Sequence, residues 1–267
     1  MNMSDLIYDL GLHRGEDTEF YLKKGFRVVA IDANPELCAR ARQTFSPHIA
    51  DGRLIIVNKA ISDQRGTLTF YKNELTEWGT VDPDWARRNE RLGKKSEEIE
   101  VEAAPFEDII AEFGLPYFIK IDIEGMDMVA LRSLKLSAER PKYISIESEK
   151  VSFGKLREEF ETFRELGYDR FKVVRQDTVR KQRPPNPPRE GSYADHAFTF
   201  GASGLFGDEA PGEWLTAEQA IEAYKSIFLR YHLVGDEPLL GPNLVRVLNR
   251  LRYRAGWYDT HARLAGS

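Results

Sequence analysis

Cysteine is almost absent from this chain of 267 residues, and long apolar runs are missing. Its one cysteine, Cys38, excludes an intrachain disulfide and a cysteine-rich metal site. No apolar stretch approaches the roughly 20 residues that a membrane-spanning helix needs. The N-terminus has no cationic segment followed by an apolar one, so we expect no signal peptide. These absences make the cytoplasm the expected compartment.

An excess of positive charge is missing as well. The formal net charge is −5, although 30% of the residues are charged. Proteins that bind nucleic acid usually carry a clustered basic surface, so we expect no nucleic-acid partner. The sequence has no internal repeats. Its length suits one large α/β domain with an appendage and is enough to bury a large core.

Residues 5–34 have the pattern of strand, glycine turn, helix and strand. The apolar run over residues 6–10 is typical of a buried strand, and Gly11 and Gly15 bracket the turn after it. The second strand ends at Asp32, 21 residues after Gly11. This is the layout of a nucleotide-binding βαβ unit, in which the carboxylate at the second strand can accept hydrogen bonds from ribose hydroxyls.

The glycine turn does not match the common phosphate-binding motifs. A dinucleotide motif needs glycine where His13 stands, and no Gly-Lys-Ser/Thr sequence exists for a P-loop. Asp9, at the end of the first strand, would repel a pyrophosphate but suits a cationic ligand. S-adenosylmethionine carries an ammonium and a sulfonium and has no phosphate. The pattern D-x-G-x-x-x-G, followed by a strand that ends in an acid, resembles the cofactor site of Rossmann-like methyltransferases.

Apolar strands and helices alternate through most of the chain, which predicts a Rossmann-like, doubly wound α/β fold with a mostly parallel sheet. Asp17 and Thr18 can cap the first helix, and residues 196–200 are the expected last strand. We divide the chain into a Rossmann-like domain over residues 1–201 and a C-terminal helical extension over residues 202–267. The extension has two expected helices, over residues 217–232 and 243–254, packed on the sheet or across the partner of a homodimer.

Residues 72–98 form a polar stretch of irregular period that carries Trp78 and Trp85. Two tryptophans in a hydrophilic stretch suggest a lid insertion that packs over a bound substrate, with an indole stacking on a sugar face. The alternative is a surface segment that its aromatic side chains anchor to the core.

Carboxylates stand at the ends of four expected strands, and parallel strands end at the same, ligand-binding edge of a sheet. Helix capping is the alternative explanation for any one of them. Capping explains Asp32 poorly, because Asn34 is the better cap for the helix that follows. Ala60, after the third strand, can lie against an adenine ring. The candidate cofactor-binding residues are Asp9, Gly11, His13, Gly15, Asp32, Asn34, Ala60 and Asp122.

A hydroxyl that accepts a methyl group must lose its proton to a nearby base. Asp122, Glu124 and Glu147 are the candidate catalytic residues, because they follow the strands nearest the expected methyl group. His196 and His261 are further candidate bases. Clustered acids can also hold Mg²⁺, but no ligand spacing in the sequence requires a metal, so we expect none.

The string IKIDIEG at residues 119–125, placed after the D-x-G turn, resembles the FkbM family of S-adenosylmethionine-dependent methyltransferases. That family shows D-x-G-A-N-x-G early and I-K-x-D-x-E-G later, and the resemblance covers roughly residues 6–149. This chain departs from it at His13, where the family has asparagine, although imidazole can still form hydrogen bonds. The matching positions are Asp9, Gly11, Gly15, Lys120, Asp122, Glu124 and Gly125.

The resemblance implies a sheet of the class I methyltransferase type, S-adenosylmethionine as the cofactor, and O-methylation of sugars, glycans or polyketides. We therefore expect a methyltransferase that acts on a hydroxyl of a sugar, glycan or other small-molecule acceptor. An NAD(P)-dependent oxidoreductase is the main alternative, and His13 and Asp9 argue against it. A non-catalytic cofactor-binding protein is the second alternative, and the acids at several strand ends argue against it. The sequence does not identify the acceptor or the position that is methylated.

Overall fold

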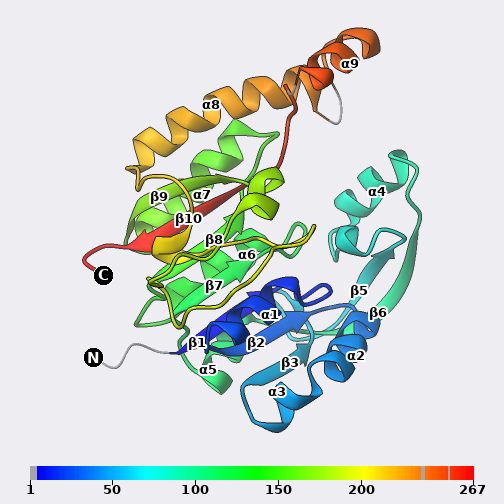
Figure 1. Ribbon diagram of the computed structural model, residues 1–267. Helices are drawn as coiled ribbons and strands as arrows, with labels where there is room; N and C mark the ends of the chain where they lie inside the picture. The colour runs from blue at the N-terminus through cyan, green and yellow to red at the C-terminus, as the bar shows by residue number, and fades with distance from the viewer. Residues whose placement is uncertain (1–4, 236–237, 252) are drawn as a thin grey trace.

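The computed structural model describes residues 5–235, 238–251 and 253–267, and it is built around a seven-stranded sheet (Figure 1). The strands are β1 (Leu6–Leu10), β2 (Arg27–Asp32), β3 (Leu54–Asn58), β7 (Phe118–Ile121), β8 (Tyr143–Glu147), β9 (Tyr168–Arg175) and β10 (Tyr258–Leu264). Their order across the sheet is β3-β2-β1-β7-β8-β10-β9. Six of these strands run in the same direction, and β10, which lies between β8 and β9, runs in the opposite direction. The predicted doubly wound, mostly parallel sheet is confirmed.

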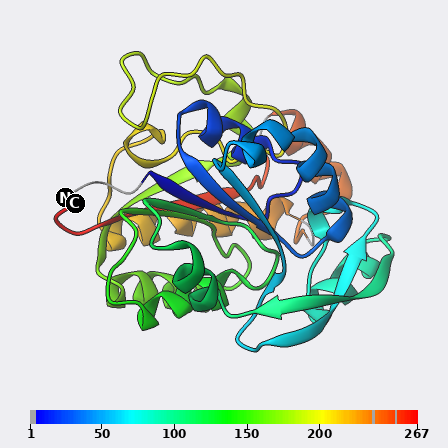
Figure 2. The same ribbon diagram turned by 90° about the horizontal axis from the view of Figure 1, so that it is seen from below.

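Helices cover both faces of this sheet (Figure 2). One face packs against α5 (Phe106–Phe113), α6 (Asp127–Ser133), α7 (Phe153–Glu165) and α8 (Ala217–Val234). The other packs against α1 (Glu16–Lys23), α2 (Pro35–Thr44) and an irregular stretch around residues 179–206. Successive side chains of a strand point to opposite faces, so Tyr8 enters the core on the first of these faces and Ile7 the core on the second. In the described part of the chain, every helix is too short or too polar to cross a bilayer.

A second, three-stranded sheet lies beyond the carboxyl ends of β1–β3 (Figure 1). It consists of β4 (Ala60–Ile61), β5 (Gly66–Asn73) and β6 (Ser96–Ala104), in the order β4-β6-β5. The chain carries α4 (Pro83–Arg91) between the antiparallel β5 and β6. Most of residues 72–98 is therefore an excursion from this sheet, toward the ligand-binding edge of the main one. The remaining helices are α3 (Ser46–Ala50) and α9 (Pro242–Arg250).

The last strand is not where the sequence predicted it. Residues 196–200 are irregular, and β10 (Tyr258–Leu264) instead lies between β8 and β9. Sequence reading missed β10 because Asp259, His261 and Arg263 make it look like a polar tail. The tail does contain the two predicted helices, but it is not purely helical, since its last strand completes the main sheet. The division at residue 201 stays a prediction.

Candidate active site

The site lies at the carboxyl ends of β1, β7 and β8, where the order of strands in the sheet reverses. Open α/β sheets bind ligands at such a point. The turn after β1 meets the turn after β7 here, since the backbone N–H of Asp122 donates to the Leu10 carbonyl at 3.0 Å. Gly11 has a φ of 87°. The structure therefore brings the predicted glycine turn and the predicted catalytic Asp122 together.

Asp32 ends β2 and holds the glycine turn in place. Its carboxylate accepts hydrogen bonds from the backbone N–H of His13 at 2.9 Å and of Asn34 at 2.8 Å. Burial raises the pKa of this carboxyl, against the effect of the two backbone bonds. The Asn34 side chain caps α2, as predicted, by accepting from Glu36 and Leu37. A carboxylate has about four lone-pair sites, so Asp32 keeps acceptors for a ribose.

Asp9 lies beneath the turn and is fully buried. Its carboxylate accepts a hydrogen bond from the Thr18 hydroxyl at 2.6 Å and pairs with the Lys120 ammonium at 3.4 Å. Lys120 in turn donates to the Gly11 carbonyl at 2.9 Å. Burial lowers the pKa of Lys120, but Asp9 and Asp122 outweigh burial and hold that pKa above its usual range. A charged lysine therefore ties the floor of the site to the turn.

The predicted capping of α1 by Asp17 and Thr18 is wrong. Gly15, with a φ of 87°, is the N-cap, so both residues lie inside the first turn and are buried. A side chain at Gly15 would start 2.5 Å from the Phe45 ring, which explains the glycine. Asp17 accepts from the backbone N–H of Ser203 at 2.8 and 3.0 Å, and burial raises its pKa to about 7. This carboxyl therefore anchors the irregular stretch over the sheet.

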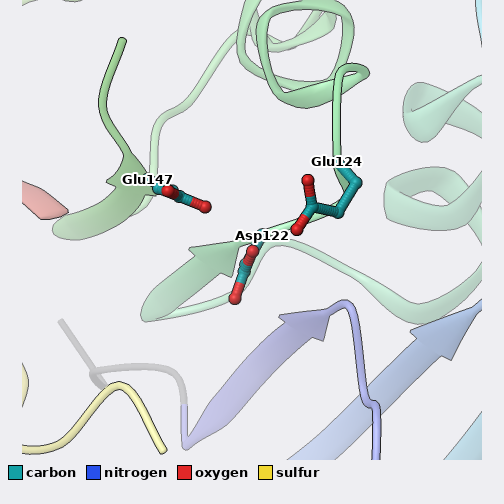
Figure 3. Close-up of side chains that lie close together, drawn as sticks. All are labelled: Asp122, Glu124 and Glu147. Carbon is teal, nitrogen blue, oxygen red and sulfur yellow. The ribbon is translucent and has the colours of Figure 1, made fainter. Parts of the chain in front are cut away.

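The three predicted catalytic carboxylates converge (Figure 3). Asp122, Glu124 and Glu147 each offer an oxygen, and these oxygens all lie within 4.8 Å of one another. The side chain of Asp122 is 39% exposed and that of Glu147 is 26% exposed. The Lys150 ammonium lies 2.5 Å from Glu147, and the Lys120 ammonium lies 3.6 Å from Asp122. Asp122 and Glu147 are thus open to solvent, and lysine partly balances the charge of the cluster.

The turn that carries Glu124 is held from two sides. Glu124 has a φ of 46°, and Gly125 after it has a φ of 100°. The Asp127 carboxylate accepts from the backbone N–H of Ile123 and of Gly125, each at 3.1 Å. The Thr80 hydroxyl donates to the Glu124 carbonyl at 2.6 Å. These bonds fix a left-handed conformation that a glutamate rarely adopts.

A fourth carboxylate, Asp259 of β10, lies beside the cluster. It pairs directly with Glu147 across the antiparallel strands, so the two side chains share a face. Burial first, then Asp122 and Glu147, raise the pKa of Asp259 well above its usual value. Burial and the same neighbouring acids likewise raise the pKa of Glu124. Sequence reading missed Asp259, although the alternation of polar and apolar residues over 258–264 was a signal for a strand.

The excursion between β5 and β6 reaches the site at three points. Thr80 binds the turn after β7, as described. Thr76 lies 2.8 Å from the imidazole Nε2 of His13, at the glycine turn. The Trp85 ring packs on Gly125, where an added Cβ would lie 3.2 Å from it. Residues far apart in the chain thereby join the excursion to both turns of the site.

Three other candidates lie away from the carboxylates. Ala60 is buried in the core of the small sheet. The ring of His196 packs against that of Phe20 at a tilt of 36°. His261 lies deeper in the main sheet, opposite Ser145, and burial lowers its pKa to about 3. In the described part of the chain, neither histidine has a hydrogen bond or ion pair with Asp122, Glu124 or Glu147.

Among solved structures, the chain is similar to the methyltransferase FkbM from Methylobacillus flagellatus, with 18% identity and a TM-score of 0.44 over 65% of this chain. It spans 41% of that protein's length. Two methyltransferase structures in complex with S-adenosyl-L-homocysteine also match. The one from Thiobacillus denitrificans has 13% identity and a TM-score of 0.37 over 99% of this chain and 86% of that chain. The one from Geobacter sulfurreducens has 13% identity and a TM-score of 0.37 over 98% and 84%.

No curated protein matches the chain. The model of the methyltransferase FkbM domain matches residues 9–170, which is more than half of the chain. That match includes the glycine turn and all three predicted catalytic carboxylates, and it removes the oxidoreductase alternative. Residues 9–170 are thus a methyltransferase domain whose cofactor is S-adenosylmethionine, and the chain belongs to the FkbM methyltransferase domain family.

Proposed function

We propose that this protein transfers a methyl group to a hydroxyl of a sugar, a glycan or another small-molecule acceptor. The convergence of Asp122, Glu124 and Glu147 beside the glycine turn is the observation that carries the proposal. A hydroxyl acceptor must give up its proton as its oxygen is methylated, and carboxylates can take that proton. Several carboxylates around one point can also hold a polyol by accepting hydrogen bonds from its hydroxyl groups.

The residues around the turn fit the cofactor. S-adenosylmethionine, when bound, supplies a methyl group on a positively charged sulfur. The acidic edge suits that charge, and Asp32 has acceptors for the ribose. We propose that Gly11, His13, Gly15, Asp32 and Asp122 line the cofactor site. Asp9, Asn34 and Ala60, which are buried, support it from behind.

The three carboxylates differ in ways that suggest separate roles. The side chain of Asp122 is more exposed than that of Glu147, so an acceptor reaches it readily. Burial and the neighbouring acids raise the pKa of Glu124, so its ionised form is a stronger base than an ordinary glutamate, which favours it as the base. Glu147 is paired with Lys150, which holds its carboxylate in place to orient an acceptor hydroxyl. Alignment of the acceptor is the main contribution that the site has to make.

We further propose that the excursion over residues 72–98 covers the acceptor. Its contacts with His13, Gly125 and the Glu124 carbonyl support this role, because they join the excursion to both turns of the site. Trp78 and Trp85 would offer apolar surface to a sugar ring. The cytoplasmic location and the homodimer stay predictions from the sequence.

The test combines binding and product analysis. In calorimetric titrations, we expect S-adenosylmethionine to bind and NAD to show no heat of binding. The protein is then incubated with S-adenosylmethionine and separate panels of sugars, oligosaccharides, polyketide alcohols and amines, and products are analysed by mass spectrometry. We expect a methyl group on oxygen, with turnover reduced at least tenfold in Asp122→Asn.

The exposed Asp169→Asn, on β9, is the matched control and should retain wild-type turnover. Methylation of amines alone would contradict the proposal. Binding of the cofactor with no methylated product from any panel would favour the non-catalytic alternative.

A further inference from the structure

We infer that Asp122, Glu124, Glu147 and Asp259 form a binding site for a hard divalent cation, Mg²⁺ or Mn²⁺. The spacing of the first three fits one ion, since their nearest oxygens lie within 4.8 Å of one another. Oxygens on opposite sides of Mg²⁺ are about 4 Å apart, and those around the larger Ca²⁺ are about 5 Å apart. Small rotations of these partly buried side chains would therefore bring the oxygens to bonding distance.

Asp259 provides independent evidence for a ligand at this place. Its residue is only 7% exposed, and it lies outside the group of three whose oxygens are within 4.8 Å of one another. Within the described part of the chain, charge acts on its carboxylate from Asp122, Glu147, Lys120 and Asp17, and no side-chain hydrogen bond holds it. It lies on the same face as Glu147, directly opposite it, and repels both Glu147 and Asp122. Burying a carboxylate without a partner is costly, and a bound cation removes that cost.

The carboxylates around the proposed site outnumber the ammonium groups, so the site has an excess of negative charge. Lys120 lies 3.6 Å from Asp122, and Lys150 lies 2.5 Å from Glu147. Four carboxylates thus face two ammonium groups, of which Lys120 is shared with Asp9 and Asp17, and Asp127 adds a further negative charge near Glu124. One divalent cation would balance the four carboxylates of the proposed site.

The donor set selects the kind of ion. All four proposed ligands are carboxylates, which suit Mg²⁺, Mn²⁺ and Ca²⁺, whereas zinc and copper sites use histidine or cysteine. Mg²⁺ usually keeps open positions for water and substrate oxygens. In the role that rests on the proposed function, two neighbouring hydroxyls of an acceptor would occupy those positions. The ion would lower the pKa of the reacting hydroxyl, and its proton would pass to the Glu124 carboxylate oxygen that does not bind the ion.

Sequence spacing did not require a metal because the fourth carboxylate lies on β10, which the sequence did not predict. Asp122 and Asp259 are separated by most of the C-terminal half of the chain. Their meeting depends on β10 inserting beside β8.

The experiment uses the full chain, treated with EDTA and dialysed. Mn²⁺ is titrated in the absence of S-adenosylmethionine, and the bound ion is counted by calorimetry and by electron paramagnetic resonance. We expect one ion per chain and competition by Mg²⁺. Asp259→Asn should weaken Mn²⁺ binding at least tenfold, and Asp169→Asn should leave it unchanged.

Two outcomes would overturn the site: no Mn²⁺ binding at millimolar concentrations, or equal binding by the wild type and Asp259→Asn. If Asp259→Asn does not fold, Glu124→Gln takes its place, with the same expected loss. The same EDTA-treated protein is also titrated with S-adenosylmethionine. Cofactor binding without ion binding would refute only the ion site, whereas ion binding without cofactor binding would refute only the proposed function.

Discussion

The carbonyl oxygen of Asp122 lies where a side chain on Gly11 would begin: an added Cβ would be 1.9 Å from it. Two turns from distant parts of the chain therefore touch through backbone atoms alone. Gly11 is needed for this approach and also for its left-handed φ of 87°. The contact sets the position of the catalytic candidate relative to the cofactor turn.

We expect Gly11→Ala to lower the free energy of unfolding by about 2–5 kcal/mol, because it combines a left-handed alanine with a backbone clash. Gly52→Ala is the control, since Gly52 also has a positive φ but has no atom within 4 Å of an added Cβ. It should cost only about 1–2 kcal/mol. Denaturant unfolding measures both. Equal losses in the two variants would show that the contact with Asp122 is not tight.

Asp32→Asn should weaken binding of S-adenosylmethionine by about 1–3 kcal/mol, because an amide cannot accept both backbone bonds and a ribose hydroxyl. Calorimetric titration measures the dissociation constant. Asp63→Asn, at an exposed position outside the turn, is the control. A dissociation constant in Asp32→Asn equal to that of the wild type would remove Asp32 from the cofactor site.

Thr80→Val should loosen the turn after β7, because the hydroxyl that binds the Glu124 carbonyl is lost while the side-chain shape is kept. We expect faster amide hydrogen exchange over residues 122–127 and a loss of about 1 kcal/mol in stability. Thr69→Val removes an exposed hydrogen bond to Glu100 on the small sheet and serves as the control. If exchange in residues 122–127 is the same in both variants, the excursion does not hold this turn.

Stability should fall as the pH rises from about 5 to 8, in part because of Glu159. This carboxyl is buried beneath Ser148, and burial raises its pKa to about 8. The folded state therefore holds a proton that the unfolded state releases near the usual glutamate pKa of 4.5. The contribution is present below pH 4.5 and is lost as the pH rises through 8, by about 5 kcal/mol at most.

Glu159→Gln isolates this effect, because it keeps the shape and cannot ionise. Its stability should exceed that of the wild type at pH 8.5 and be similar to it at pH 5, as measured by urea unfolding at both values. If the wild type and the variant lose the same stability between pH 5 and 8.5, other groups, such as Asp17 and Asp127, cause the pH dependence.

The sequence by itself determined the parts of the site that depend on neighbouring residues. Turns with positive φ favour glycine, which marked Gly11 and Gly15. The cap at Asn34 and the strand end at Asp32 also follow from short-range patterns, and both stand where the sequence placed them. Even so, the cap of α1 was predicted two or three residues too late, because the packing of Gly15 on Phe45 decided it.

Only the tertiary structure decided what surrounds Asp122 and Glu147. Asp259 joins them because β10 closes a loop of more than a hundred residues and inserts between β8 and β9. Thr260, next to Asp259, binds Ser148 from 112 positions away. A strand with both faces covered can carry buried polar residues when partners from distant strands surround them. Local pattern cannot reveal such partners, so the fourth carboxylate and the contacts of Thr80 and Thr76 became visible only in the folded chain.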